Sequence, residues 1–291
     1  MKTFLSFLMP LTASFIVLAT ACPAQPQTAQ PQKGRVLIVG GGGTTNAIKE
    51  RLLRDAGGPK KARMLIVPYA DMKEGPKTAE AYRKYGCTNV DFMSCPPEEI
   101  DKPENLKKLD GVNVIYFSGG YQRILASALH GTRFLERIHQ LHQAGATVGG
   151  TSAGAAVMSK VMIITRQHVL PKGKKSAAPG VIAEGHVNIG EGFGFVTGMI
   201  VDQHFIVRKR LPSLFSALLD HPDMLGVGID EKTAIDVSPD GSFEVVGASS
   251  VMVFKPMFKQ GERPRFDVQI LQNGDRHTPP QTAPSVPLLK S

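Results

Sequence analysis

Short apolar runs alternate along this chain with longer segments in which apolar residues recur every three or four positions. Such runs are typical of buried strands, and the longer repeat is typical of amphipathic helices. The pattern predicts strands over 35–39, 64–69, 88–93, 112–117, 146–149, 160–165, 199–202, 225–229, 233–237, 243–246 and 250–254. It predicts helices over 44–56, 78–85, 122–129, 132–144, 153–159 and 211–219, and a short polar helix within 96–109. Strands that alternate with helices favour parallel pairing, so we predict an α/β fold. A hairpin turn at 238–241 opens a β-rich C-terminal region.

The first 33 residues predict an export signal and a tether. Lys2 precedes an apolar run over 4–18 and three small residues before Cys22, which is the pattern of a signal peptide over 1–21. It also resembles a bacterial lipoprotein signal, in which Cys22 would carry a lipid anchor. The Pro/Gln-rich stretch 22–33 is a tether, 34–272 a single catalytic domain, and the Pro-rich stretch 273–291 a loose tail.

Composition narrows the classes of partner. The 291 residues are 42% apolar and 20% charged, as in ordinary globular proteins, and the net charge of +9 is scattered rather than gathered in a nucleic-acid-binding pattern. We therefore expect no nucleic acid partner. The run Gly40 to Gly43 lacks the Lys-Ser/Thr of a phosphate-binding loop, so we expect a tight turn lining a cleft and no nucleotide cofactor. No histidine spacing suggests a metal. A strand between Cys87 and Cys95 would hold their Cα atoms roughly 25 Å apart, so we expect no disulfide.

The most informative stretch runs from Val148 to Met158. It places Ser152 between Gly150 and Gly154, after a short apolar strand and before a small-residue helix. Glycines on both sides of a serine allow a sharp turn from strand to helix, which exposes the hydroxyl at the carboxyl edge of the sheet. Ser152 is therefore the candidate nucleophile, and the amide of Ala153 is a candidate donor to an oxyanion.

A serine nucleophile needs a base, and the base needs a carboxylate behind it. His204 directly follows an apolar strand, and we expect that strand to end at the same sheet rim as the strand before Ser152. For the carboxylate, Glu231 is preferred and Asp230 is held in reserve, because a shift of one residue decides which faces the cleft. The order Ser, His, acid differs from that of α/β-hydrolases.

Four blocks together resemble the signature of the cyanophycinase family: 117–122, 150–159, 202–210 and 228–234. The resemblance implies a three-layer α/β/α sandwich related to class I glutamine amidotransferases, and cleavage of a poly-aspartate backbone whose β-carboxylates carry arginine, releasing β-Asp-Arg dipeptides. It implies Ser152, His204 and Glu231 as the catalytic triad and the amides of Gly120 and Ala153 as the oxyanion hole. Around the substrate it implies Gln122, Asp202, Gln203, Arg208 and Arg210. Homodimers are common in the family.

Two positions depart from the family pattern. Tyr121 replaces the usual Asp of a Gly-Gly-Asp-Gln block, and Ser213 stands where a third arginine is usual. The stretch 166–194, with a basic cluster at 172–175, is longer than in typical members. We predict an exported serine exopeptidase acting on aspartate-rich peptide. The alternatives are an aspartyl or isoaspartyl dipeptidase of the same fold, and a non-catalytic lipoprotein that binds acidic peptides.

Overall fold

The computed structural model describes residues 33–165, 180–259 and 261–279. Every described residue belongs to one compact unit. The predicted signal peptide, Cys22, the tether up to residue 32 and the basic cluster at 172–175 lie outside the described residues, and those assignments stay predictions. Within the described ranges, no helix combines the length and the apolar character needed to cross a membrane.

The helices and strands follow one another mainly as the apolar pattern predicts. In chain order they are β1 (Val36–Val39), α1 (Asn46–Leu53), β2 (Arg63–Val67), α2 (Glu74–Lys84), β3 (Asn89–Phe92), the 3-10 turn η1 (Pro97–Glu99), α3 (Pro103–Leu106), the 3-10 turn η2 (Lys107–Leu109), β4 (Val114–Phe117), α4 (Gln122–Leu129), α5 (Arg133–Gln143), β5 (Thr147–Thr151), α6 (Ala153–Ala156), β6 (Val161–Thr165), β7 (Asn188–Glu191), β8 (Met199–Gln203), α7 (Leu211–Asp220), β9 (Leu225–Ile229), β10 (Thr233–Val237), β11 (Phe243–Gly247), β12 (Val251–Pro256), β13 (Phe266–Leu271) and β14 (Arg276–His277). The short polar helix expected within 96–109 is α3, and Pro97 and Pro103 each stand at the first position of a helical turn there.

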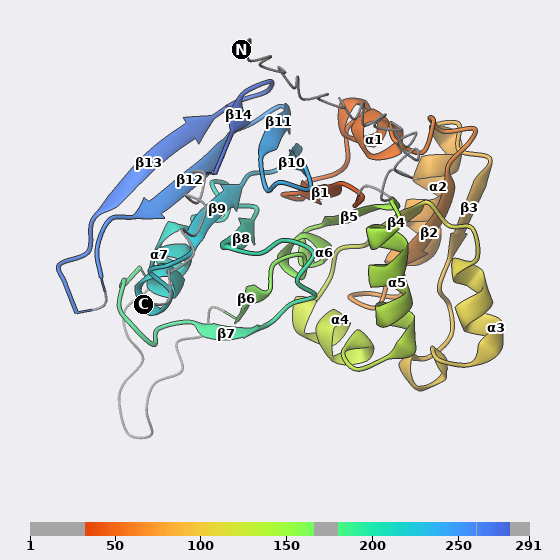
Figure 1. Ribbon diagram of the computed structural model, residues 1–291, viewed down its shortest axis with the longest axis horizontal. Helices are drawn as coiled ribbons and strands as arrows, with labels where there is room; N and C mark the ends of the chain where they lie inside the picture. The colour runs from red at the N-terminus through yellow and green to blue at the C-terminus, as the bar shows by residue number, and fades with distance from the viewer. Residues whose placement is uncertain (1–32, 166–179, 260, 280–291) are drawn as a thin grey trace, which may run out of the picture. The chain divides into compact units, whose positions relative to one another are not determined.

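The central sheet has eight strands in the order β14-β11-β10-β1-β5-β4-β2-β3 (Figure 1). Strands β1, β5, β4, β2 and β3 are parallel neighbours, whereas β10, β11 and β14 pair in antiparallel fashion. The predicted hairpin at 238–241 joins β10 to β11. Strand β14 continues the sheet, so residues 276–277 are ordered by pairing, in contrast to the loose tail expected from residue 273 onward.

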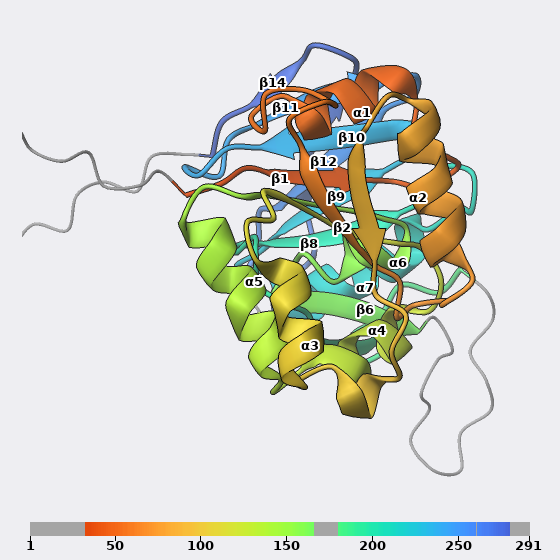
Figure 2. The ribbon, with the colours of Figure 1, turned by 90° about the vertical axis from the view of Figure 1, so that its right-hand side faces the viewer.

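The pleat of the parallel strands separates two apolar cores. Leu37 and Val39 point to the face that α1 and α2 cover, whereas Val36 and Ile38 point to the face that α4, α5 and α6 cover. Figure 2 shows α1 and α2 on one side of the strands and α4 and α5 on the other. The mixed α/β class and the largely parallel central sheet are therefore confirmed.

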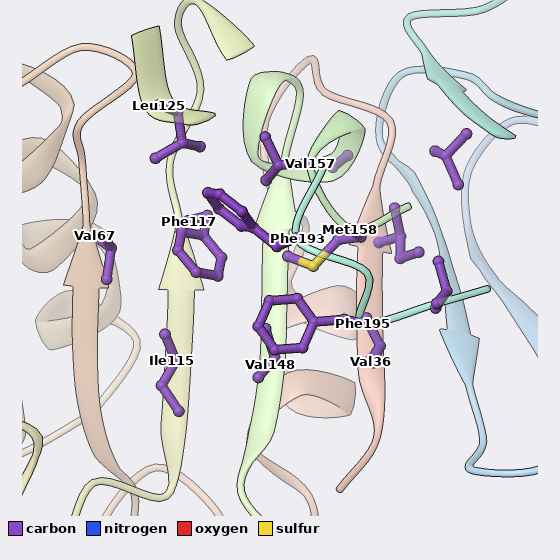
Figure 3. Packing of buried hydrophobic residues seen from close by; sticks show 14 of the residues in the cluster. Val36, Val67, Ile115, Phe117, Leu125, Val148, Val157, Met158, Phe193 and Phe195 are labelled. Carbon is purple, nitrogen blue, oxygen red and sulfur yellow. The ribbon is translucent and has the colours of Figure 1, made fainter. Parts of the chain in front are cut away.

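Aromatic side chains fill the core on the α4–α6 face. In Figure 3, Phe117, Phe193, Phe195 and Met158 gather over the strands next to α6. The ring centroids of Phe117 and Phe193 are 5.2 Å apart, and all four side chains are buried. Burial of such a side chain contributes about 1.5–3 kcal/mol, so this cluster fixes the segment that leads into β8.

Strands β8 and β9 do not join the central sheet. They are parallel neighbours in a second sheet of order β13-β12-β9-β8, which α7 contacts. The expectation that the strands preceding Ser152 and His204 end at the rim of one sheet is therefore wrong. Strand β7, inside the stretch expected to be a long loop, and strand β13 were not predicted. In β13, four of the six residues are exposed, so no buried apolar run marks it.

Candidate active site

Ser152 occupies a sharp turn between β5 and α6. Its backbone has φ 53° and ψ −111°, a conformation that costs a non-glycine residue about 1–3 kcal/mol. A Cβ added at Gly150 would lie 2.4 Å from the carbonyl oxygen of Gly154, and one added at Gly154 would lie 2.1 Å from that of Phe117. Both glycines are required because the backbone of another residue lies too close to each of them to leave room for a side chain.

His204 lies between Ser152 and Glu231. Its Nε2 atom is 3.0 Å from the Oγ atom of Ser152, and its Nδ1 atom is 2.6 Å from the Oε1 atom of Glu231. A carboxylate that accepts the Nδ1 proton leaves the Nε2 lone pair free to accept the serine hydroxyl proton. The side chain of His204 is 6% exposed and that of Glu231 is 29% exposed, so the ring is held in a largely dry setting.

The run of glycines after β1 packs against this pair. A Cβ added at Gly41 would lie 2.4 Å from the Nε2 atom of His204, and one added at Gly42 would lie 2.6 Å from the Oε2 atom of Glu231. The amide of His204 also donates to the carbonyl of Gly40 at 2.7 Å. This turn therefore lines a cleft, as the sequence predicts, and its glycines make room for the imidazole and the carboxylate.

Asp230, the reserve candidate for the carboxylate, has other partners. Its Oδ1 atom accepts hydrogen bonds from the amides of Ile206 and Val207, both at 3.1 Å, and its Oδ2 atom accepts one from the hydroxyl of Ser249 at 2.8 Å. Asp230 therefore fixes the turn that follows His204, and Glu231 is the carboxylate in contact with the imidazole.

A pocket of about 530 Å³ opens beside Ser152 and His204. Gly119 and Gly120 lie on its wall, and Ala153 follows Ser152 at the first position of α6. Its charged lining groups carry both signs: Lys49, Lys77 and Arg208 against Asp71 and Glu74. Hydroxyl groups complete the lining, and burial raises the pKa of the Tyr82 and Tyr116 phenols, which keeps both neutral. A site with these groups can hold a peptide that carries both charges.

Comparison with known proteins identifies the family. Residues 36–245 match the sequence profile of peptidase family S51. The chain belongs to peptidase family S51. This S51 peptidase is 32% identical to a cyanophycinase from Nostoc sp. over 237 residues, which cover 79% of this chain and 76% of the relative. It is also 32% identical to a cyanophycinase from Synechococcus elongatus over 244 residues, covering 80% and 72% of the two chains.

Solved structures agree with this membership. A peptidase from an acI-B1 actinobacterium superposes on the S51 peptidase with a TM-score of 0.61 and 26% identity, over 86% of this chain and 98% of the other. A putative peptidase E protein from Listeria monocytogenes shares the fold, with a TM-score of 0.51 and 16% identity over 75% and 100% of the chains. The protein is therefore a serine-type peptidase, rather than a non-catalytic binding module.

Some residues expected to contact substrate in this S51 peptidase are buried away from the pocket. The guanidinium of Arg210 donates to the carboxylate of Asp202 at 2.7 Å, and the two residues are 4% and 2% exposed. Gln203 is buried beside them. A direct substrate contact for Asp202, Gln203 and Arg210 is therefore not borne out, because these side chains lie inside the second sheet and its loop. Arg208 does line the pocket.

Gln122 also differs from the expectation. The side-chain amide of Gln122 donates to the carbonyls of Ile163 and Ile164 at 3.0 and 3.2 Å, so it holds β6 against α4. Tyr121 is 71% exposed and is not among the residues that line the pocket.

The sequence reasoning missed Asp71, Glu74 and Lys77. They follow the carboxyl end of β2, where the general rule for parallel sheets places ligand contacts. That rule could have found them.

Proposed function

We propose that the protein is an exported serine exopeptidase that hydrolyses aspartyl peptide bonds of cyanophycin, with Ser152 as nucleophile, His204 as general base and Glu231 as the carboxylate that orients it. The observation that carries the proposal is the continuous series of contacts from Glu231 through His204 to Ser152, at 2.6 and 3.0 Å. Identity to cyanophycinases over most of the chain supports the substrate class.

The mechanism follows from these contacts. The Oγ atom of Ser152 attacks the peptide carbonyl carbon while its proton passes to the Nε2 atom of His204, and Glu231 stabilises the imidazolium. The amides of Gly120 and Ala153 donate to the oxyanion. The imidazolium then protonates the leaving amine, which yields an acyl-enzyme. Water then attacks the acyl carbon while its proton passes to the Nε2 atom of His204. The bond between the acyl carbon and Oγ breaks, the imidazolium returns the proton to Oγ of Ser152, and the acid product leaves.

The charges of the pocket suit a substrate in which each aspartate carries an arginine. Arg208 and the two lysines can bind carboxylates, whereas Asp71 and Glu74 can bind a guanidinium. Glu74 already pairs with Lys77 at 2.8 Å, but the side chain of Lys77 is 68% exposed and that of Glu74 is 36% exposed, so water weakens this pair and it can exchange partners.

Export rests on the N-terminal signal alone, with Cys22 as a proposed lipid anchor. The lipid anchor can be tested by fractionation of cells that express either the full chain or its Cys22→Ala variant. The full chain should be found in the membrane fraction, and the variant should not.

A dipeptidase specific for aspartyl or isoaspartyl dipeptides is the second candidate. Tyr121 favours it, because an exposed phenol replaces the carboxylate usual in cyanophycinases and cannot form a charge-assisted bond with guanidinium.

The experiment compares the wild type with Ser152→Ala and His204→Ala on three substrates: cyanophycin, Asp-X dipeptides and β-Asp-X dipeptides. Mass spectrometry should find β-Asp-Arg released from the polymer by the wild type only, and Ser152→Ala should melt within a few degrees of it. Turnover of dipeptides without polymer cleavage would support the dipeptidase. Hydrolysis retained by Ser152→Ala would refute the assignment of the nucleophile.

A further inference from the structure

A second pocket lies at the opposite end of the central sheet from Ser152. Ser152 follows the carboxyl end of β5, whereas Arg35 precedes the amino end of β1, its parallel neighbour. This pocket of about 290 Å³ is lined by four arginines, which come from separate elements: Arg35 before β1, Arg51 and Arg54 at the end of α1, and Arg276 in β14. We call it the arginine pocket.

Two carboxylates, those of Asp236 and Glu244, form ion pairs with these four guanidinium groups. Asp236, which is 2% exposed, accepts from Arg35 at 2.7 Å, Arg51 at 3.0 Å and Arg54 at 3.3 Å. Glu244 accepts from Arg51 at 2.7 Å and from Arg276 at 3.1 Å. The inner cluster therefore carries an excess of positive charge.

Two further carboxylates stand at the periphery of this cluster. Asp55 pairs with Arg54 at 3.0 Å, but both side chains are 40% exposed or more, and Asp240 is bound to Ser242 in the exposed turn after β10. Water screens both of these groups, so they offset little of the charge inside the pocket.

The guanidinium groups also keep donors for a ligand. Each guanidinium has five N–H donors, and within the described residues Arg276 commits one of them to a side chain of the protein. The side chains of Arg276 and Arg54 are 78% and 44% exposed, so their remaining donors are accessible. Guanidinium donors match the oxygens of phosphate and carboxylate in pairs.

His277 supplies an independent sign of a missing partner. Its ring lines the pocket and stacks on Phe243, with centroids 5.1 Å apart, and it is 9% exposed. Its Nδ1 atom is 3.1 Å from the Oε1 atom of Gln269, whereas its buried Nε2 atom has no hydrogen-bond partner among residues 33–165, 180–259 and 261–279. Burial lowers the pKa of His277, which favours a neutral ring. With Nδ1 donating to Gln269, Nε2 holds a lone pair and requires a donor.

We propose that the arginine pocket binds inorganic phosphate. Phosphate has four oxygens in a tetrahedral arrangement, which can accept hydrogen bonds from guanidinium groups on three different elements. A planar carboxylate offers only two oxygens. Inorganic phosphate near neutral pH also keeps a P–O–H group, which can donate to Nε2 of His277. A phospholipid diester offers the same phosphate oxygens but lacks that hydroxyl, so the geometry favours the free ion over a lipid headgroup.

The test is calorimetric titration of the full chain with sodium phosphate, at an ionic strength held constant with sodium chloride. Arg54→Gln with Arg276→Gln should weaken phosphate binding at least ~10-fold, because two charge-assisted donors are lost. The matched control, Arg263→Gln with Arg265→Gln, removes the same charge from the exposed turn between β12 and β13 and should leave the affinity within about 2-fold. His277→Phe keeps the stacking on Phe243 and should weaken binding several-fold.

Three other results would overturn the proposal. One is the absence of phosphate binding, which would leave the cluster as an ion-pair network of purely structural importance. Another is binding that both double variants reduce equally. The last is variant-sensitive binding to phosphatidylglycerol vesicles, relative to phosphatidylcholine, without binding of free phosphate. Circular dichroism of each variant checks the fold, and Ser152→Ala should bind phosphate as the wild type does, which separates this site from the peptidase site.

Discussion

Replacing Gly41 by alanine should displace the imidazole of His204 from Ser152. Gly41 has φ +105°, and an added Cβ would lie 2.3 Å from the Cε1 atom and 2.4 Å from the Nε2 atom of His204. The substitution therefore has two effects: backbone strain, and a collision with the ring. These effects can be separated, because Gly86 has φ +109° and an added Cβ there would meet nothing within 4 Å.

The strain alone should cost about 1–2 kcal/mol of unfolding free energy in both variants, since both place alanine at positive φ. The collision is confined to Gly41→Ala. Carbon atoms in contact normally lie about 3.5–4.0 Å apart, so the ring must move by more than ~1 Å. A displacement of that size breaks the 3.0 Å contact with Ser152 and should lower kcat/KM by about 10²-fold.

The assay uses two measurements at a temperature well below the melting point of both variants. The first is kcat/KM on the peptide substrate, and the second is the rate constant for covalent labelling of Ser152 by a phosphonate, which requires the activated hydroxyl but not the correct substrate. Gly41→Ala should be slowed about 10²-fold in both measurements, and Gly86→Ala should stay within ~2-fold of the wild type. Equal labelling rates in the two variants would refute the inference that the glycine turn makes room for the base.

Two further predictions concern buried ionisable groups. Arg210→Met should lower the unfolding free energy in urea by about 3–5 kcal/mol, because Asp202 stays buried without its guanidinium, and adding Asp202→Leu should restore part of the loss; a loss below ~1 kcal/mol for the single variant would contradict this. Burial lowers the pKa of His142 to about 4, so as the pH falls from ~6.5 toward 4 the unfolded chain gains a proton that the folded chain does not. The unfolding free energy in urea should fall by up to about 3 kcal/mol over that window, and His142→Leu should flatten the decline; an equal decline in the variant would contradict the assignment.

The alternation of apolar runs and helical repeats located β1, β2, β4 and β5 of the central sheet, because these strands are almost entirely buried and leave a strong signal. It did not locate β14, which has only two residues. The same signal could not assign β8 and β9 to a second sheet. An apolar run such as 199–202 records burial but not which neighbour it pairs with, and pairing is set by the connections around it. Strand β13, largely exposed, left no such run.

The site residues divide in a similar way. Ser152 could be found from the sequence because the glycines on both sides of it are required by the local turn. His204 and Glu231 could be found because each follows the end of a predicted strand. The resemblance to the family placed Asp202 and Arg210 around the substrate, and only the three-dimensional structure shows that they are buried against each other.

The choice between Asp230 and Glu231 depended on one residue of register, which the structure supplies. In the parallel pair β8 and β9, Gln203 lies opposite Ile229. His204 is therefore level with Asp230, and Glu231 lies one residue further on. Asp230 is near enough to His204 to have been a plausible partner, yet its oxygens hold the amides of Ile206 and Val207.

The two acids thus have complementary effects on one histidine. His204 has φ 51°, an unfavourable conformation for histidine that the surrounding contacts must maintain. Asp230 holds the turn directly after it, and the amide of Arg210 donates to the carbonyl of Phe205 at 2.9 Å, which closes the loop at its far end. With the backbone held on that side and the glycine turn packed against the ring, the carboxylate of Glu231 needs only to fix the tautomer. The buried ion pair between Arg210 and Asp202 joins the end of this loop to β8, so its removal should loosen the turn that holds the proposed base, His204, and lower kcat/KM even though neither residue lines the pocket.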